Sequence, residues 1–463
     1  MRIIRKSFNN KFMNIFVLAI LFVILITFTD YSYDKIPYIR LLALALICYH
    51  FTFLKINKIW FGDLAFSYTA ANYLFIISYV FIWEHGCEKL LWNTGYSAEL
   101  WIKAFLYGLC YIHAVFTGLL WSCRKKEFSE QFIESRNKSY NPKMIFAIGI
   151  ILLIISMPCK FYVDALFIIT NRGKGIYSSV LGKDQVNGII FNLSLISNVA
   201  LIYIIASKHL TKKTAILFFI LFFTYGLGIT TFTGGRRFIV TAFLASFPCL
   251  IYSYQIKIKL KYFIFICLAG YGGIVFLKTV SATRLLLASS ITEYLSYAWE
   301  YIQNNNVFYD FLEEFGNTIY AYIIAFDCYP RILDFAHGRS LIFVWVLAIP
   351  GMGRLLPNLA SSVSVSKYAQ DNYNYWFGGA LGQEMYCNFG FVAVWLSVGL
   401  GMLFKRFLGS TSERLPIATA RYFSMSYILL NLVRSDLYEF TRLILWALLL
   451  PFFTHSILKR FKR

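Results

Sequence analysis

The sequence predicts an all-α polytopic membrane protein with about twelve transmembrane helices and one large outer loop. Of its 463 residues, 59% are hydrophobic and 14% are charged, and the mean hydropathy is +0.61. Soluble domains carry about 25% charged residues. The apolar residues fall in repeated blocks close to the ~20 residues that cross a bilayer. These segments are expected to be helices, because lipid offers no partner to an exposed strand edge.

The first apolar block, Phe12 to Phe28, has no small-residue cleavage pattern after it and is interpreted as a retained helix. The fifth span is short before Pro158, and a continuation towards Thr170 is an alternative. The predicted spans are 12–29, 37–54, 64–83, 100–121, 144–157, 188–207, 214–231, 238–254, 262–277, 389–404, 417–433 and 443–457.

Charge on alternate connections predicts the orientation. With the N-terminus inside, the inner segments hold more than half of the 44 Lys and Arg residues, as expected for cytoplasmic loops. Four acidic residues share that side: Glu127, Glu130, Glu134 and Glu413. Both termini are therefore expected in the cytoplasm. The net charge of +21 lies in short clusters between apolar blocks, which excludes a nucleic-acid partner as its explanation.

This orientation divides the chain into three parts. Residues 1–277 are predicted to form nine transmembrane helices and residues 389–463 three more, with residues 278–388 as a large outer loop. Within the loop, the apolar segment Ser340 to Pro350 is too short to span a bilayer. We expect it to be an interfacial or re-entrant helix.

Arginines on the outer side are informative, because the positive-inside bias acts against them. Arg236 and Arg237 follow a Gly-Gly pair in a turn between two spans, and Arg434 and Arg442 flank the last outer turn. The guanidinium fork matches phosphate oxygens and stays charged when desolvated. These four residues are candidate phosphate ligands, although pairing with nearby acids or lipid headgroups would also account for them.

The stretch that closes the large loop carries the other candidates. Gly378 and Gly379 permit close backbone approach, and Glu384 stands at the mouth of a span, where charge is costly. Glu384 could act as a general base or pair with one of the arginines as a structural partner. Asn388 lies four residues on and could bind a sugar hydroxyl or cap the helix.

Other polar residues give weaker signals. His337 and Arg339 precede the short apolar segment; the histidine is a candidate base, but a lone loop histidine is more often a surface residue. His50, His85 and His113 have no acidic or histidine partner at metal-ligand spacing, so neither a metal site nor a cofactor is expected. Of the nine cysteines, four lie in or beside outer segments: Cys87, Cys159, Cys328 and Cys387. A disulfide between two of these four stays open.

Absent motifs narrow the chemistry. The sequence has no Asp-x-Asp to hold a metal–nucleotide sugar and no P-loop. A sugar donor used outside a bacterial inner membrane has no nucleotide sugar available and would have to be lipid-linked. Its leaving group would be a polyprenyl diphosphate, an anion that clustered outer arginines could bind and stabilise.

These motifs resemble those of the Wzy-type O-antigen polymerases, over roughly residues 170 to 450. The resemblance rests on Gly378-Gly379 with Glu384-x-Tyr386-x-Asn388-Phe389-Gly390, the Gly-Gly-Arg-Arg turn at 234–237, Arg434-x-Asp436 with Arg442, and Gly338-x-Ser340 running to Ile349-Pro350. Ser435 stands where a glycine is expected.

The resemblance implies a metal-independent, GT-C-like glycosyltransferase of the bacterial inner membrane. Such enzymes move a growing O-polysaccharide from its undecaprenyl diphosphate carrier onto the next lipid-linked repeat unit at the periplasmic face. The partners implied are undecaprenyl-diphosphate-linked oligosaccharides and membrane lipids. An O-antigen ligase, which would depend on a loop histidine such as His337, and a lipid-linked oligosaccharide flippase are the alternatives. The sequence leaves open the sugars, the linkage, the oligomeric state and whether a chain-length regulator is a partner.

Overall fold

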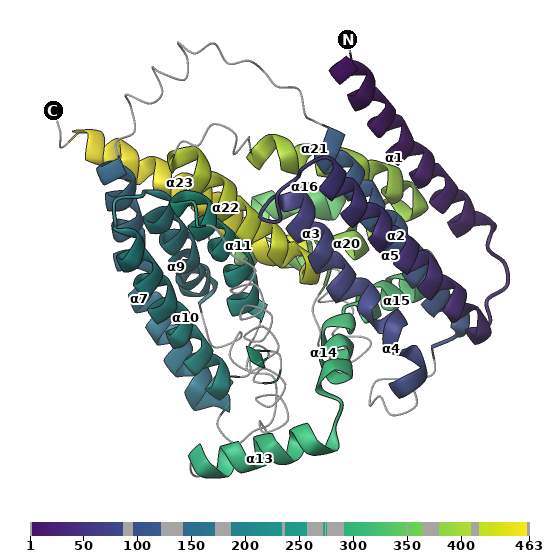
Figure 1. Ribbon diagram of the computed structural model, residues 1–463, viewed down its shortest axis with the longest axis horizontal. Helices are drawn as coiled ribbons and strands as arrows, with labels where there is room; N and C mark the ends of the chain where they lie inside the picture. Colours follow the sequence, from purple (N-terminus) through teal and green to yellow (C-terminus); the bar gives the residue numbers. More distant parts are fainter. Residues whose placement is uncertain are drawn as a thin grey trace. The chain divides into compact units, whose positions relative to one another are not determined.

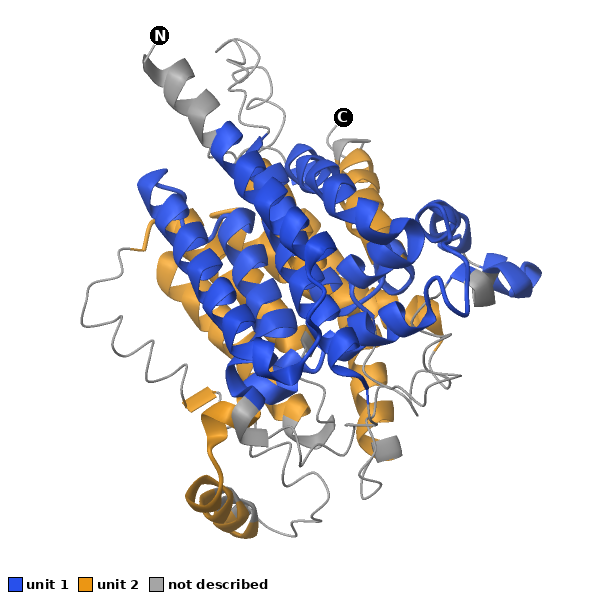
Figure 2. Ribbon diagram, turned by 90° about the vertical axis from the view of Figure 1, so that its right-hand side faces the viewer, with its two compact units in different colours: residues 1–126, 312–409, 432–441 blue, residues 127–311, 410–431, 442–463 orange. Residues whose placement is uncertain are grey.

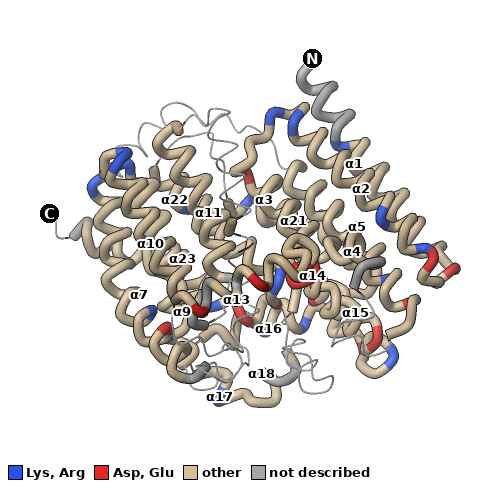
Figure 3. The backbone as a smooth tube through the Cα atoms, turned by 60° about the horizontal axis from the view of Figure 1, so that its bottom comes forward, with Lys and Arg blue, Asp and Glu red and all other residues tan. Residues whose placement is uncertain are grey.

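The regular structure in the computed structural model is helical (Figure 1). The structure describes residues 2–86, 96–121, 142–171, 187–233, 237–256, 272–273, 275, 291–349, 351–363, 379–408 and 416–460. Every regular element within these ranges is a helix, which confirms the predicted all-α polytopic class. Charged residues are sparse along the long helices in Figure 3, as an apolar surrounding requires.

Eight described helices are long and apolar enough to cross a membrane, and each overlaps a predicted span, although Leu381–Leu408 begins within the residues 278–388 that are predicted as the large loop. They are Tyr33–Ile56, Leu64–Trp83, Ala98–Trp121, Pro142–Ile169, Gly188–Ala206, Lys212–Thr230, Leu381–Leu408 and Leu437–Leu458. Two predicted spans correspond to shorter apolar helices, Lys11–Thr27 and Phe238–Tyr254. The predicted span at 417–433 overlaps α22 (Pro416–Asn431), and the one at 262–277 falls almost wholly outside the described residues. The total of twelve therefore stays a prediction.

The chain forms two compact units, coloured separately in Figure 2. Unit 1 comprises Met1–Lys126, Leu312–Gly409 and Leu432–Thr441. Its helices are α1 (Arg2–Thr27), η1 (Tyr33–Lys35), α2 (Ile36–Ile56), α3 (Leu64–Asn72), the π-helical η2 (Tyr73–Ile77), α4 (Ser78–Gly86), α5 (Ala98–Trp121), α15 (Ile319–Cys328), α16 (Arg339–Leu347), α17 (Met352–Leu355), α18 (Pro357–Val363), α20 (Leu381–Phe389), η4 (Gly390–Val392), α21 (Ala393–Leu408) and η6 (Leu432–Arg434).

Helix α5 is the centre of unit 1. It is predominantly apolar after its first turns and is buried along nearly its whole length, as expected of a helix surrounded by others. Its closest neighbour is α21, and two glycines allow the approach. A Cβ at Gly118 would lie 2.1 Å from the Val398 carbonyl oxygen, and one at Gly401 would lie 2.4 Å from that of Val115. Small residues at such crossings let the two backbones touch, which is how membrane helices gain contact energy.

Unit 2 comprises Glu127–Phe311, Ser410–Asn431 and Arg442–Arg463. Its helices are α7 (Pro142–Asn171), α9 (Gly188–Ala206), α10 (Lys212–Thr233), α11 (Arg237–Tyr254), α13 (Ile291–Asn304) and α22. Two helices run from one unit into the other, α14 (Val307–Gly316) and α23 (Leu437–Arg460). Helix α7 continues through Pro158, so the fifth predicted span takes the longer of its two alternatives.

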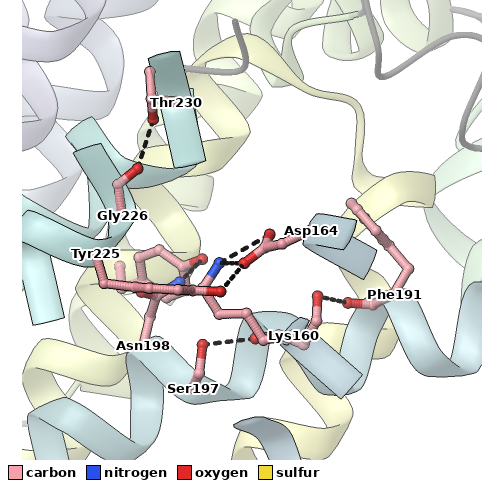
Figure 4. Close-up of polar contacts among 10 residues, drawn as sticks. Lys160, Asp164, Phe191, Ser197, Asn198, Tyr225, Gly226 and Thr230 are labelled. Carbon is pink, nitrogen blue, oxygen red and sulfur yellow. Dashed lines mark hydrogen bonds and ion pairs between the residues drawn. The ribbon is translucent and has the colours of Figure 1, made fainter. Parts of the chain in front are cut away.

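A charged cluster fastens α7 to α10 within unit 2 (Figure 4). The Lys160 ammonium lies 2.9 Å from Asp164 Oδ2, one helical turn away, and 5.5 Å from the centroid of the Tyr225 ring. The Tyr225 hydroxyl donates to the same carboxylate at 2.7 Å. Ionisable groups in a span are costly unless paired, and here the pairing also joins two helices.

The described cysteines are free thiols. Cys159, Cys328 and Cys387 are unbridged, so no disulfide forms among these three of the four outer candidates. Cys87 lies outside the described residues.

The α5–α21 crossing leads to the first prediction. Replacing Gly401 with alanine should destabilise the protein by about 1–3 kcal/mol, because the new methyl group meets backbone atoms that cannot move independently. The matched control is Gly399→Ala in the same helix, where an added Cβ has nothing within 4 Å. The measurement is the apparent Tm of each detergent-solubilised variant. Equal Tm values for the two variants would contradict the crossing.

Candidate functional site

Helix α20 carries Glu384 and Asn388, two candidate residues that the sequence places near the start of a predicted span. Its first turn is closed by the Gln383 side chain, whose Oε1 accepts from the Ala380 N–H at 3.1 Å. Gly379, just before, is buried, and Gly378 lies outside the described residues. The helix packs tightly because Gly382 has no side chain: a Cβ there would lie 2.3 Å from the Tyr322 hydroxyl oxygen.

The Glu384 carboxylate is 1% exposed and is bound at both oxygens. Oε1 accepts from the Ser340 hydroxyl at 2.8 Å, and Oε2 accepts from the Leu437 backbone N–H at 2.8 Å. Leu437 is the first residue of α23, so the carboxylate lies at a helix N-terminus, where free N–H groups and the helix dipole favour an anion. One side chain thus joins α20 to α16 and to the first turn of α23.

Asn388, one turn after Glu384, completes this network and is fully buried. Its Nδ2 donates to Ser340 Oγ at 2.7 Å and to the Glu384 carbonyl at 2.8 Å, while Oδ1 accepts from the Gly338 N–H at 2.9 Å. The donors therefore form an ordered sequence from the Gly338 N–H, through Asn388 and the Ser340 hydroxyl, to Glu384. Such a closed network fixes the orientation of every member.

The turn before α16 is held against the C-terminal end of α20. The Ala336 N–H donates to the Cys387 carbonyl and the His337 N–H to the Asn388 carbonyl, each at 3.0 Å. His337 (φ 47°) and Gly338 (φ 84°) both adopt left-handed backbone conformations, which glycine tolerates and histidine rarely takes. The side chains of His337 and of Arg339, the first residue of α16, are exposed.

The candidate arginines lie in different surroundings. Arg434 is half-buried in η6 of unit 1, with its guanidinium carbon 5.9 Å from the centroid of the Phe75 ring. Arg442, in unit 2, is half-buried near the first residue of α9, since a Cβ at Gly188 would lie 2.9 Å from its Nη1. Arg236 lies outside the described residues, as does the side chain of Arg237, the first residue of α11.

Sequence reasoning missed the two donors that bind Glu384. Ser340 entered only as part of a family motif, and the Leu437 N–H is a backbone group that no side-chain pattern reveals. The available signal was the Gly-x-Ser spacing at the start of the apolar segment. Within the described residues, no group of three His, Cys, Asp or Glu side chains could hold a metal ion.

This network of hydrogen bonds around Glu384 joins two of the motifs that resemble one family, Gly338-x-Ser340 and the stretch from Glu384 to Gly390. The family model of the O-antigen polysaccharide polymerase Wzy matches residues 11–461. The chain belongs to this family. The match confirms the resemblance and extends it to the N-terminal spans. No curated protein and no solved structure matches the chain significantly. As a Wzy family member, the protein is a multi-pass membrane protein of lipopolysaccharide biosynthesis.

The network around Glu384 leads to the second prediction. Ser340→Ala in this Wzy protein leaves a buried carboxylate oxygen and a buried amide N–H without their partner, which should cost about 1–3 kcal/mol. The matched control is Ser397→Ala, because Ser397 is equally buried but bonds only the Ala393 carbonyl of its own helix. The apparent Tm should fall for Ser340→Ala and change little for Ser397→Ala. A similar loss in both variants would show that the network adds no stability.

Proposed function

We propose that the protein polymerises undecaprenyl-diphosphate-linked O-antigen repeat units at the periplasmic face of the bacterial inner membrane. The growing glycan passes from its lipid carrier to the next lipid-linked repeat unit. The observation that carries this proposal is the family match over nearly the whole chain. The basic inner connections support an orientation with both termini in the cytoplasm. In this orientation residues 278–388 form the periplasmic loop.

The described part of that loop suits this placement. Between Ile291 and Val363 it contains only short helices, of which the longest, α13, has 14 residues and cannot cross a bilayer. Ser340, which binds Glu384, comes from the same loop. The loop therefore supplies part of the structure around Glu384 at its own end, and we assign it the role of covering the sugar substrate.

In the proposed reaction, a hydroxyl of the acceptor repeat unit attacks the anomeric carbon of the lipid-linked glycan. The bond between that carbon and the carrier's phosphate oxygen breaks, and undecaprenyl diphosphate leaves with the bonding electrons and takes up the proton that the attacking hydroxyl loses. Guanidinium groups lower the energy of this leaving group by binding its phosphate oxygens. We assign this role to Arg236, Arg237, Arg434 and Arg442, on the strength of their outer positions in the sequence.

We assign Glu384 a positioning role in this reaction. A general base must come within hydrogen-bond reach of the proton it removes. Both Glu384 oxygens instead accept from protein donors, and the side chain is buried. Through the Leu437 N–H it fixes the first residue of α23, and Arg434 lies only three residues earlier in the same turn. Glu384 therefore sets the backbone that carries a proposed phosphate ligand.

Substitutions of Glu384 distinguish the positioning role from the general base. Glutamine can still accept from the Leu437 N–H through its amide oxygen and donate to Ser340 Oγ, whereas alanine can do neither. We expect Glu384→Gln to keep most of the O-antigen ladder in a complemented deletion strain and Glu384→Ala to reduce it about tenfold or more. Immunoblotting controls for expression. If both variants lose the ladder although they are expressed normally, the result would support the role of general base for Glu384 instead.

The overall function is tested by the surface polysaccharide of a deletion strain. Loss of a polymerase should leave lipid A–core bearing a single repeat unit on a silver-stained gel, and complementation should restore the ladder. A ligase deletion would instead leave bare core with lipid-linked polymer, and a flippase deletion would leave neither on the outside. Either of these two patterns would overturn the proposal.

A further inference from the structure

Helix α16 has two unlike faces. Ser340, Val344 and Leu347 are buried, and Val344 and Leu347 pack against Val363 and the first residues of α23. Ile342, Trp345 and Ile349 are 65%, 40% and 54% exposed. The spacing of these three residues, three and then four apart, places them on one side of the helical segment. An apolar row opposite a packed face needs a partner of its own.

The position of α16 along a membrane span identifies that partner. The turn before α16 is hydrogen-bonded to the Asn388 carbonyl, within the candidate span Leu381–Leu408. Immediately after this level, the same span exposes Val392 (59%) and Trp395 (37%). Apolar side chains that are exposed on a span are expected to face lipid. The apolar row of α16 therefore begins at the depth where the exposed face of the neighbouring span, Leu381–Leu408, enters hydrocarbon.

Length and charge restrict how α16 meets the lipid. Its nine residues extend over about 14 Å, half of a hydrocarbon core of about 30 Å, so it stays within one leaflet. Arg339 at its start and Arg354 in α17 are exposed, with the apolar row between them in the sequence. Arginines at the ends of an apolar segment reach lipid phosphates while their stems stay in the interface.

We propose that α16 is seated in one leaflet of the bilayer, with Ile342, Trp345 and Ile349 among phospholipid acyl chains and Arg339 and Arg354 at the headgroups. Its buried face carries Ser340, which donates to Glu384. The bilayer thereby holds in place the helix that supplies this hydroxyl. The inference concerns the lipid surface of the protein and does not rest on the proposed function.

Position-specific quenching tests this arrangement. An environment-sensitive fluorescent amino acid replaces Ile342 or Ile349 in the full-length protein, reconstituted in phosphatidylethanolamine–phosphatidylglycerol vesicles. We expect quenching by phospholipids brominated on their acyl chains, stronger for bromines near the headgroup than near the chain ends, and little quenching by iodide. The matched controls are Asp334, which is exposed before α16, and Val344, which is 1% exposed. Iodide should quench the label at Asp334, and neither quencher should reach Val344.

Two outcomes would overturn the proposal. Strong iodide quenching at Ile342 and Ile349, similar to that at Asp334, would place the apolar row in water. Protection from both quenchers at these positions would mean that protein covers the row, either a second copy of the chain or another partner. Size-exclusion chromatography of each labelled variant verifies folding, and Ile342 and Ile349 provide independent readings, because a label that disturbs one position leaves the other.

Discussion

The structure around the site depends on the hydrogen bonds that one buried carboxylate, that of Glu384, accepts from the protein. A charged group that is removed from water must be given donors by the protein, or the cost of its burial is not offset. Glu384 receives a hydroxyl from Ser340 and a backbone N–H from Leu437, which come from segments far apart in the sequence. Because the two donors approach different oxygens, α16 and the first turn of α23 have fixed positions relative to α20. The carboxylate thus determines local architecture before any role in chemistry is considered.

The same requirement explains how a span can be interrupted at this point. The span Leu381–Leu408 breaks at Gly390, whose φ of 56° ends α20, and the last carbonyls of that helix lose their intrahelical partners. The Ala336 and His337 N–H groups bind two of them, at Cys387 and Asn388, and the Gly390 N–H binds the Tyr386 carbonyl. Irregular backbone at membrane depth is tolerated where protein groups satisfy it. The left-handed conformation of His337 follows from this role, because it turns successive N–H groups towards the helix end.

The sequence predicted the features that depend on local composition, such as the spans. It did not predict the contacts between residues that are far apart in the chain. Eight spans overlap predicted ones because each apolar block carries its own signal. Glu384 could be singled out because charge is rare beside a span, and Asn388 because it shares the same helix face. Ser340, 44 residues from Glu384, has no property in the sequence that marks its partner. The Leu437 donor is a backbone N–H, a group that nearly every residue has, so the sequence alone could not identify it as the partner of Glu384. The glycines at 118 and 401 had no visible partner for the same reason.

The turn before α23 shows how a departure from the family pattern is accommodated. Asp436 accepts from the Glu439 N–H at 3.2 Å and so caps the helix, with Glu439 three residues on as in a capping box. In that motif the glutamate usually accepts from the cap residue's own N–H. Here the Ser435 hydroxyl, fully buried, donates to Glu439 Oε2 at 2.5 Å. A glycine at 435, which the family resemblance leads one to expect, could not supply this donor. The serine therefore gives Glu439 a hydroxyl donor in the turn that precedes α23, and it does so without altering the Leu437 N–H that Glu384 needs.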